Sequence, residues 1–264
     1  MAKVRAHHLR AMKENGEKIT MLTAYDAITA HIFDEAGIDM LLVGDSYGMT
    51  MLGYQSTVPV TMEQMELAIG AVARGTKRAF IVGDMPFGSY EASDSDAVAN
   101  AVRLIKAGAN AVKLEGGERM ADRIKAITQA GILVVGHIGY TPQSENALGG
   151  PRVQGRGDAA LAVTNDAQAV EDAGAIAVVL EMVPYDIAHE ITERLNIPTI
   201  GIGAGKLTDG QVLVWSDMAG MQEWTPKFVK VFGEVGAALR QATVAYKDAV
   251  KNLEFPDRTH AFDH

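Results

Sequence analysis

The chain has 264 residues, of which 48% are apolar, a formal net charge of −9 and no cysteine. The negative charge argues against a nucleic-acid or acidic-membrane surface, and the lack of cysteine excludes disulfides, thiolate nucleophiles and a cysteine-based zinc site. Its first residues lack the apolar stretch of a secretory signal, and no apolar run approaches the ~18 residues of a membrane helix, so we expect a cytoplasmic protein.

Short apolar runs bounded by turn signals recur along the chain and predict buried parallel strands. Ala-Gly pairs at 36–37, 107–108, 130–131 and 173–174 stand just ahead of such runs, as expected where a helix ends on a glycine. Ser93–Ala107, for example, has helical apolar spacing behind a Ser-Asp start. The expected strands are Ile19–Thr23, Met40–Asp45, Ala79–Asp84, Ala111–Glu115, Ile132–His137, Ile176–Glu181, Pro198–Ile202 and Val212–Trp215.

Eight strands alternating with helices predict an α/β protein with the (β/α)8 TIM-barrel fold. Six strands would leave an open doubly wound sheet, but no Gly-x-Gly-x-x-Gly follows the first strand, which weakens a dinucleotide-binding interpretation. We expect one domain over residues 1–264, with an extra N-terminal helix near Ala6–Asn15 and a long C-terminal helix from Pro226 to about Asn252.

Five of the predicted strands end on a residue that can bind a metal or move a proton: Asp45, Asp84, Glu115, His137 and Glu181. The carboxyl ends of all strands meet on one face of a parallel barrel, where barrel enzymes keep their active sites. Buried charge is costly unless it is paired or bound to a cation. The pattern therefore predicts an enzyme.

Three carboxylates, Asp45, Asp84 and Glu115, end consecutive predicted strands, which lie about 4.8 Å apart in a sheet. Left empty, such a cluster repels itself, and oxygen ligands suit Mg²⁺ or Mn²⁺ better than zinc. The alternative is that each carboxylate caps a helix or bonds a loop. Lys113 shares the strand face of Glu115 and is either a salt-bridge partner within the barrel or an anchor for a substrate carboxylate.

His137 and Glu181 are expected across the mouth from the metal, where either side chain could transfer a proton. A histidine with a purely structural role is the alternative for His137.

At these residues the chain resembles the ketopantoate hydroxymethyltransferase family, from about Ile19 to Phe262. The resemblance rests on several blocks in one order: TAYD (23–26), VGDS (43–46), STVPV (56–60), VKLEGG (112–117), GHIGYTPQS (136–144), VQGRG (153–157), LEMVP (180–184), IGIGAG (200–205) and PKF (226–228). Met221–Trp224 departs from the Gly-rich turn that is usual in the family, which leaves the folate contacts there open.

The resemblance implies a TIM barrel with one Mg²⁺ per subunit and 5,10-methylenetetrahydrofolate as co-substrate. It also implies a homo-oligomer, a decamer, that acts in pantothenate biosynthesis. It assigns the metal to Asp45, Asp84 and Glu115, and it assigns catalysis to Glu181 and His137. Substrate contacts fall on Asp45, Ser46, Asp84 and Lys113.

Together, the residues and the resemblance predict that 3-methyl-2-oxobutanoate loses its C3 proton to Glu181, with Mg²⁺ stabilising the enolate and Lys113 holding the carboxylate. The enolate then attacks the one-carbon unit, and His137 bonds the new hydroxyl group. A Schiff base on Lys113 is the minor alternative. Two other classes remain: a phosphoenolpyruvate mutase or isocitrate lyase relative, which usually carries a reactive cysteine loop that this chain lacks, and a catalytically silent binding or assembly barrel.

Overall fold

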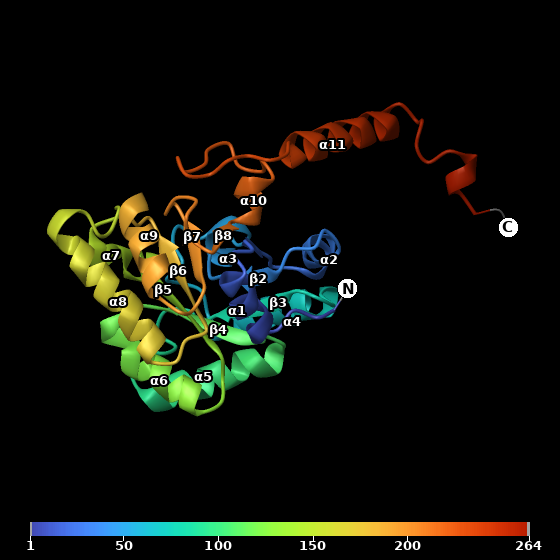
Figure 1. Cartoon of the computed structure of the whole chain (residues 1–264). Helices are drawn as coiled ribbons and strands as arrows, with labels where there is room; N and C mark the ends of the chain where they lie inside the picture. The colour runs from blue at the N-terminus through green and yellow to red at the C-terminus, as the bar shows by residue number, and fades with distance from the viewer. Residues whose placement is uncertain (1, 263–264) are drawn as a thin grey trace. The chain divides into compact units, whose positions relative to one another are not determined.

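The computed structural model describes residues 2–262, which form two compact units that meet at the Val214–Trp215 bond (Figure 1). All eight strands described within 2–262 belong to the first unit, and the long C-terminal helix belongs to the second. The expectation of one domain over the whole chain stays a prediction.

The strands of the first unit form a closed parallel barrel in chain order, with β8 pairing back onto β1. The predicted TIM-barrel fold is therefore confirmed, and the open sheet is excluded. The strands are β1 (Ile19–Thr23), β2 (Met40–Val43), β3 (Phe80–Asp84), β4 (Ala111–Glu115), β5 (Val134–Gly139), β6 (Ala177–Glu181), β7 (Thr199–Ile202) and β8 (Gly210–Leu213).

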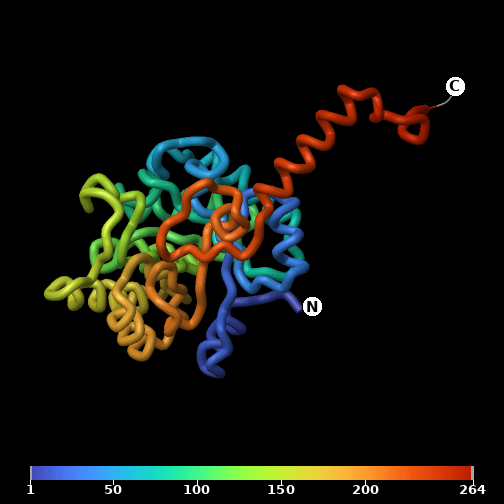
Figure 2. Tube along the Cα trace, turned by 90° about the horizontal axis from the view of Figure 1, so that it is seen from above, coloured from blue at the N-terminus to red at the C-terminus, as the bar shows by residue number. Residues whose placement is uncertain are grey.

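Helices surround the strands in chain order, as the view from above in Figure 2 shows. They are α1 (Ala6–Glu14), α2 (Ala27–Glu35), α3 (Tyr47–Thr50), α4 (Met62–Gly75), α5 (Asp94–Ala107), α6 (Ala121–Gln129), α7 (Glu145–Leu148), α8 (Ala160–Asp172) and α9 (Tyr185–Arg194). The Ala-Gly signals are confirmed, because Gly37, Gly108, Gly131 and Gly174 all have positive φ angles, between 84° and 125°. Only glycine adopts such angles without strain, so each pair ends a helix and turns the chain toward the next strand.

Successive side chains of each strand alternate between the barrel interior and the layer beneath the helices, because a strand has a period of two. Phe80 and Val82 of β3 pack with the interior side chains, whereas Ile81 packs with the outer layer. The same alternation sends Asp84, Lys113 and Glu115 inward. The register of the barrel pairs Asp84 with Lys113 and Glu115 with His137 on neighbouring strands.

The predicted N-terminal helix is confirmed as α1, and it closes the amino-terminal end of the barrel. Val4 and Leu9 are buried against the interior side chains. Lys13 Nζ forms a 2.7 Å ion pair with Asp209, which lies directly before β8. The opposite, carboxyl-terminal end is therefore the one left to hold a functional site.

Several predicted strand boundaries are wrong: β3, β5, β6 and β7 begin one or two residues later than predicted, and three further differences affect the site or the eighth strand. Strand β2 ends at Val43, so Asp45 lies two residues beyond it, and β5 runs on to Gly139, so His137 lies inside the strand. The eighth strand is Gly210–Leu213 rather than Val212–Trp215, because Trp215 begins helix α10 (Trp215–Met218). Periodicity alone did not separate this strand from the short helix that follows it.

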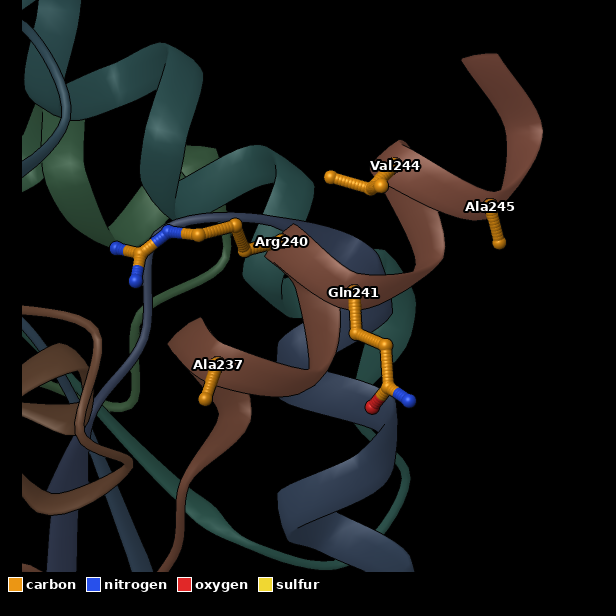
Figure 3. A pocket seen from close by; sticks show the side chains of 5 residues that line it. All are labelled: Ala237, Arg240, Gln241, Val244 and Ala245. Atoms are coloured by element: carbon orange, nitrogen blue, oxygen red, sulfur yellow. The ribbon is translucent and has the colours of Figure 1, made fainter. Parts of the chain in front are cut away.

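The C-terminal helix begins later than predicted. Helix α11 spans Val235–Lys251, and residues 226–234, which contain Pro226 and Gly233, form loops. No residue of α11 is buried. The side chains of Ala237, Arg240, Gln241, Val244 and Ala245, labelled in Figure 3, line a hollow of about 450 Å³ on this helix.

No helix among residues 2–262 is both long enough and apolar enough to cross a bilayer.

Asp34 joins the end of α2 to the start of β3 and allows a test of the fold. Its buried carboxylate accepts hydrogen bonds from the backbone N–H groups of Lys77, Arg78 and Ala79, at 2.9, 3.0 and 2.6 Å. Burial alone would raise the pKa of Asp34, but these three donors lower it below its usual value. The ionised carboxylate therefore stabilises the fold at neutral pH, and this contribution is lost as the pH falls through the lowered pKa.

Asp34→Asn should lower the free energy of unfolding at pH 7 by about 2 kcal/mol, because an amide NH2 group then faces backbone donors. Urea denaturation followed by circular dichroism measures this change. Glu35→Gln, on a side chain that is 70% exposed, is the matched control. Equal midpoints for the two variants would show that Asp34 does not hold this junction together.

Candidate functional site

The carboxyl-terminal end of the barrel brings five of the predicted site residues into one buried cluster. Lys113 Nζ lies 2.8 Å from Asp84 Oδ1 and 3.7 Å from Glu115 Oε1. His137 Nδ1 lies 3.3 Å from Glu115 Oε1, and His137 Nε2 lies 3.2 Å from Glu181 Oε2. We call Asp84, Lys113, Glu115, His137 and Glu181, together with Asp45, the strand-end cluster.

Asp45 joins this cluster from the loop after β2. Its backbone N–H donates to Asp84 Oδ2 at 3.1 Å, and its own Oδ2 accepts a hydrogen bond from Gln143 Nε2 at 2.9 Å. The three carboxylates predicted to hold a metal therefore do lie together, although Asp45 reaches the cluster from a loop rather than from a strand end.

Ser46 lies at the edge of the cluster. Its Oγ is 2.8 Å from the hydroxyl of Tyr25, a buried side chain whose pKa is raised by burial. Ser46 is half-buried, so its hydroxyl can meet a bound molecule from the side of α3.

The structure corrects one expectation about the layout. His137 does not lie across the mouth from the carboxylates, because it contacts Glu115 directly. The cause is the register, which pairs Glu115 with His137 on adjacent strands. Glu181, on the next strand, contacts the far nitrogen of the same imidazole and lies one side chain further from the carboxylates.

The two ends of the cluster differ in electrostatics. Burial raises the pKa of Asp45 well above its usual value, and the neighbouring charges of Asp84 and Glu115 raise it further. Burial also raises the pKa of Asp84, although Lys113 opposes this effect. Burial would raise the pKa of Glu115 too, but Lys113 and His137 together bring it below its usual value. The ionised form is therefore least favourable at Asp45 and Asp84.

Both basic groups of the cluster are cations at neutral pH. Burial would lower the pKa of Lys113, but Asp84, Glu115 and Asp45 raise it above its usual value. Burial and Lys113 would lower the pKa of His137, but Glu115 and Glu181 outweigh them and raise it to about 9. A protonated lysine is a poor nucleophile, which disfavours a Schiff base on Lys113.

The donor set of the cluster fits a hard divalent cation. When its four carboxylates are all ionised, Lys113 and His137 balance two of the negative charges and leave an excess of two. Carboxylate oxygens are the ligands that Mg²⁺ and Mn²⁺ prefer. No three His, Cys, Asp or Glu side chains within 2–262 are arranged to hold an ion, and Asp84 is instead paired with Lys113. The metal assignment stays a prediction.

A cavity of about 430 Å³ lies at the carboxyl-terminal ends of β4 and β5. No residue of the strand-end cluster lines it, but Gly116 and Ile138, the neighbours of Glu115 and His137 in sequence, do. Asp166 of α8 also lines it and accepts a hydrogen bond from the Glu118 backbone N–H at 2.8 Å. Cavities of this size are typical of small-molecule sites.

Two residues of the site were not predicted from the sequence, Gln143 and Tyr90. Gln143 bonds both Asp45 and Glu115, and the Tyr90 hydroxyl bonds Gln143. Gln143 lies in the quoted block 136–144, on the strand-end side of β5, which was a usable signal. Tyr90 lies in a loop without periodicity, so no sequence pattern pointed to it.

The sequence of the chain matches the family model described as ketopantoate hydroxymethyltransferase over residues 3–258. The chain belongs to this family. It is 56% identical over 262 residues to the 3-methyl-2-oxobutanoate hydroxymethyltransferase of Rhodococcus jostii, covering 98% of this chain and 91% of the relative. It is 54% identical to the enzyme of the same name from Mycobacterium tuberculosis strain H37Rv, covering 98% and 93%. Membership of this family makes the chain a transferase.

Solved structures with a similar fold include phosphonopyruvate hydrolase in complex with oxalate and Mg²⁺, with a TM-score of 0.60 and 15% identity over 97% of this chain and 93% of that chain. The 2,3-dimethylmalate lyase of the PEP mutase/isocitrate lyase superfamily gives a TM-score of 0.60 and 16% identity over 98% and 92%. At these identities the likeness supports the barrel fold alone.

Lys113 is the cation on which the buried carboxylates depend. Lys113→Met should lower the free energy of unfolding of chelator-treated protein by about 3 kcal/mol, because it leaves Asp84 and Glu115 without their positive partner. Thermal and urea unfolding measure the loss, and Lys106→Met on the exposed face of α5 is the control. A Lys113→Met protein as stable as the control would mean that the pairing contributes nothing to the fold.

Proposed function

We propose that this enzyme transfers a hydroxymethyl group from 5,10-methylenetetrahydrofolate to 3-methyl-2-oxobutanoate, giving 2-dehydropantoate for pantothenate biosynthesis. The observation that carries the proposal is the strand-end cluster, in which Lys113 and the His137–Glu181 pair adjoin three buried carboxylates. The relatives that share at least 54% identity with this chain bear the name of this reaction.

A divalent cation, for which we propose one Mg²⁺ per chain held by Asp45, Asp84 and Glu115, would act as a Lewis acid on the 2-oxo acid. The ammonium of Lys113 would hold the carboxylate of the 2-oxo acid by charge, and the Ser46 hydroxyl would donate a hydrogen bond to it. The C3 carbon would then lie toward His137 and Glu181, the part of the cluster that adjoins Glu115.

Glu181 is the group proposed to accept the C3 proton. The side chain of Glu181 is 16% exposed, compared with 5% for that of His137, so it can meet a substrate that enters the mouth. His137 already carries a proton at neutral pH, because its pKa is raised to about 9. His137 is therefore suited to donate a hydrogen bond to the new hydroxyl group rather than to accept the C3 proton.

The folate donor would occupy the cavity beside β4 and β5. The support for this placement is that Gly116 and Ile138, which line the cavity, follow Glu115 and His137 directly in the sequence. We also propose a homo-oligomer, a decamer, and the exposed apolar side chains of α11, such as Leu239 and Val244, are a candidate contact surface for it.

The direct test of the proposed function is product formation. Protein incubated with 3-methyl-2-oxobutanoate, 5,10-methylenetetrahydrofolate and Mg²⁺ should form 2-dehydropantoate, which mass spectrometry detects. Omitting any one of the three, or adding a chelator, should stop product formation. A protein that forms no product with all three present does not have this function.

Exchange of the C3 proton with deuterium isolates the first step from carbon transfer. Without folate, Glu181→Gln should lower the rate of exchange into 3-methyl-2-oxobutanoate by roughly 10²–10⁴, the usual contribution of a positioned acid–base group. His137→Gln should lower it far less, and Glu190→Gln on the exposed side of α9 is the control. Loss of exchange in the histidine variant, with exchange retained in the glutamate variant, would make His137 the base.

A further inference from the structure

Gln143 is a buried polar side chain at the centre of the strand-end cluster. It lies in the 3-10 turn Pro142–Ser144 that follows β5, and only 5% of it is exposed. Glutamine is usually found at the surface, and a buried amide is costly unless its donors and acceptor all find partners. Its surroundings should therefore account for every polar atom.

Each polar atom of the Gln143 side chain has a partner. Nε2 donates to Asp45 Oδ2 and to the backbone carbonyl of Met85, both at 2.9 Å. Oε1 accepts a hydrogen bond from the hydroxyl of Tyr90 at 2.5 Å. The backbone N–H of Gln143 donates to Glu115 Oε2 at 3.0 Å. One residue thus holds a carboxylate from the β2 loop and a carboxylate from β4.

The orientation of the amide follows from its neighbours. The carbonyl of Met85 can only accept, so the NH2 group must face it, and the same group then faces Asp45. The Tyr90 hydroxyl accepts the backbone N–H of Glu115 at 3.2 Å, which leaves its own proton to donate to Gln143. Tyr90 therefore fixes Gln143 in one orientation.

This arrangement opposes the repulsion between the carboxylates. Burial and the charges of Asp84 and Glu115 raise the pKa of Asp45 well above its usual value. Of the two side-chain oxygens of Asp45, Oδ2 accepts the hydrogen bond from Gln143. Asp45, held at Oδ2, keeps its other oxygen available for a cation, whereas Oε1 of Glu115 faces Lys113 and His137. Partners that orient metal ligands in this way typically change metal affinity 10–100-fold when they are removed.

We propose that Gln143, locked by Tyr90, is the positioning residue that sets Asp45 and Glu115 for a divalent cation, an inference that rests on the metal site of the proposed function. Gln143 binds neither substrate nor metal. It acts through the two carboxylates, because its side-chain amide donates to one oxygen of Asp45 and its backbone N–H donates to one oxygen of Glu115.

Calorimetric titration of Mg²⁺ into chelator-stripped protein tests the proposal without any substrate. Gln143→Met keeps the length of the side chain, removes the donors to Asp45 and leaves the backbone bond to Glu115. It should weaken Mg²⁺ binding about 10–100-fold. Tyr90→Phe, which removes only the lock on the amide, should weaken binding in the same direction but less. Gln129→Met, on the exposed end of α6, should bind as the unchanged protein does.

Turnover separates a positioning role from a general defect of folding. In Gln143→Met the Mg²⁺ concentration for half-maximal turnover should rise by the same factor as the dissociation constant, and excess Mg²⁺ should restore kcat. If both Gln143→Met and Tyr90→Phe bind Mg²⁺ with the affinity of the protein without substitutions, the proposal is overturned. It is also overturned if the protein without substitutions binds no Mg²⁺. If the unchanged protein binds Mg²⁺ and the variants bind it weakly but no 2-dehydropantoate forms, the proposed function fails and the positioning role stands.

Discussion

Uncompensated negative charge at the carboxyl-terminal end of the barrel is the constraint on which the rest of the site depends. Asp45, Asp84 and Glu115 are all buried, and Lys113 and His137 are the basic groups that face them. Burying a carboxylate is unfavourable unless a cation or several donors compensate it. The raised pKa values of Asp45 and Asp84 show that the protein alone compensates this end incompletely. Asp45 and Asp84 are therefore the carboxylates whose ionised form the protein stabilises least.

The barrel makes this concentration of charge possible. Parallel strands are held by backbone hydrogen bonds that do not depend on the interior side chains, so the last interior position of a strand is free to carry a charged group. The positions below it, such as Phe80, Val82 and Ala111, form an apolar layer, and α1 closes the far end. The apolar side chains that stabilise the barrel and the charged cluster thus lie at opposite ends of the barrel interior, as is usual in this fold.

The sequence predicted most of the fold, because apolar runs and glycine signals are local. It also predicted which residues meet, since the ends of parallel strands must converge on one face. It misplaced His137 relative to Glu115, because the stagger between strands is a property of the closed barrel rather than of any one segment. It missed Gln143 and Tyr90, whose positions depend on how two loops fold over the strand ends. The start of α11 was set too early, since the predicted helix included Pro226 and Gly233, which lie in loops.

We propose that the buried carboxylates hold one divalent cation, and calorimetric titration of Mg²⁺ into chelator-stripped protein and into Asp84→Ala measures its stoichiometry and affinity. We expect one ion per chain in the protein without substitutions, no measurable binding in Asp84→Ala, and full binding in the control Asp122→Ala, whose carboxylate is exposed on α6. Equal Mg²⁺ affinity in Asp84→Ala and the protein without substitutions would contradict this proposal.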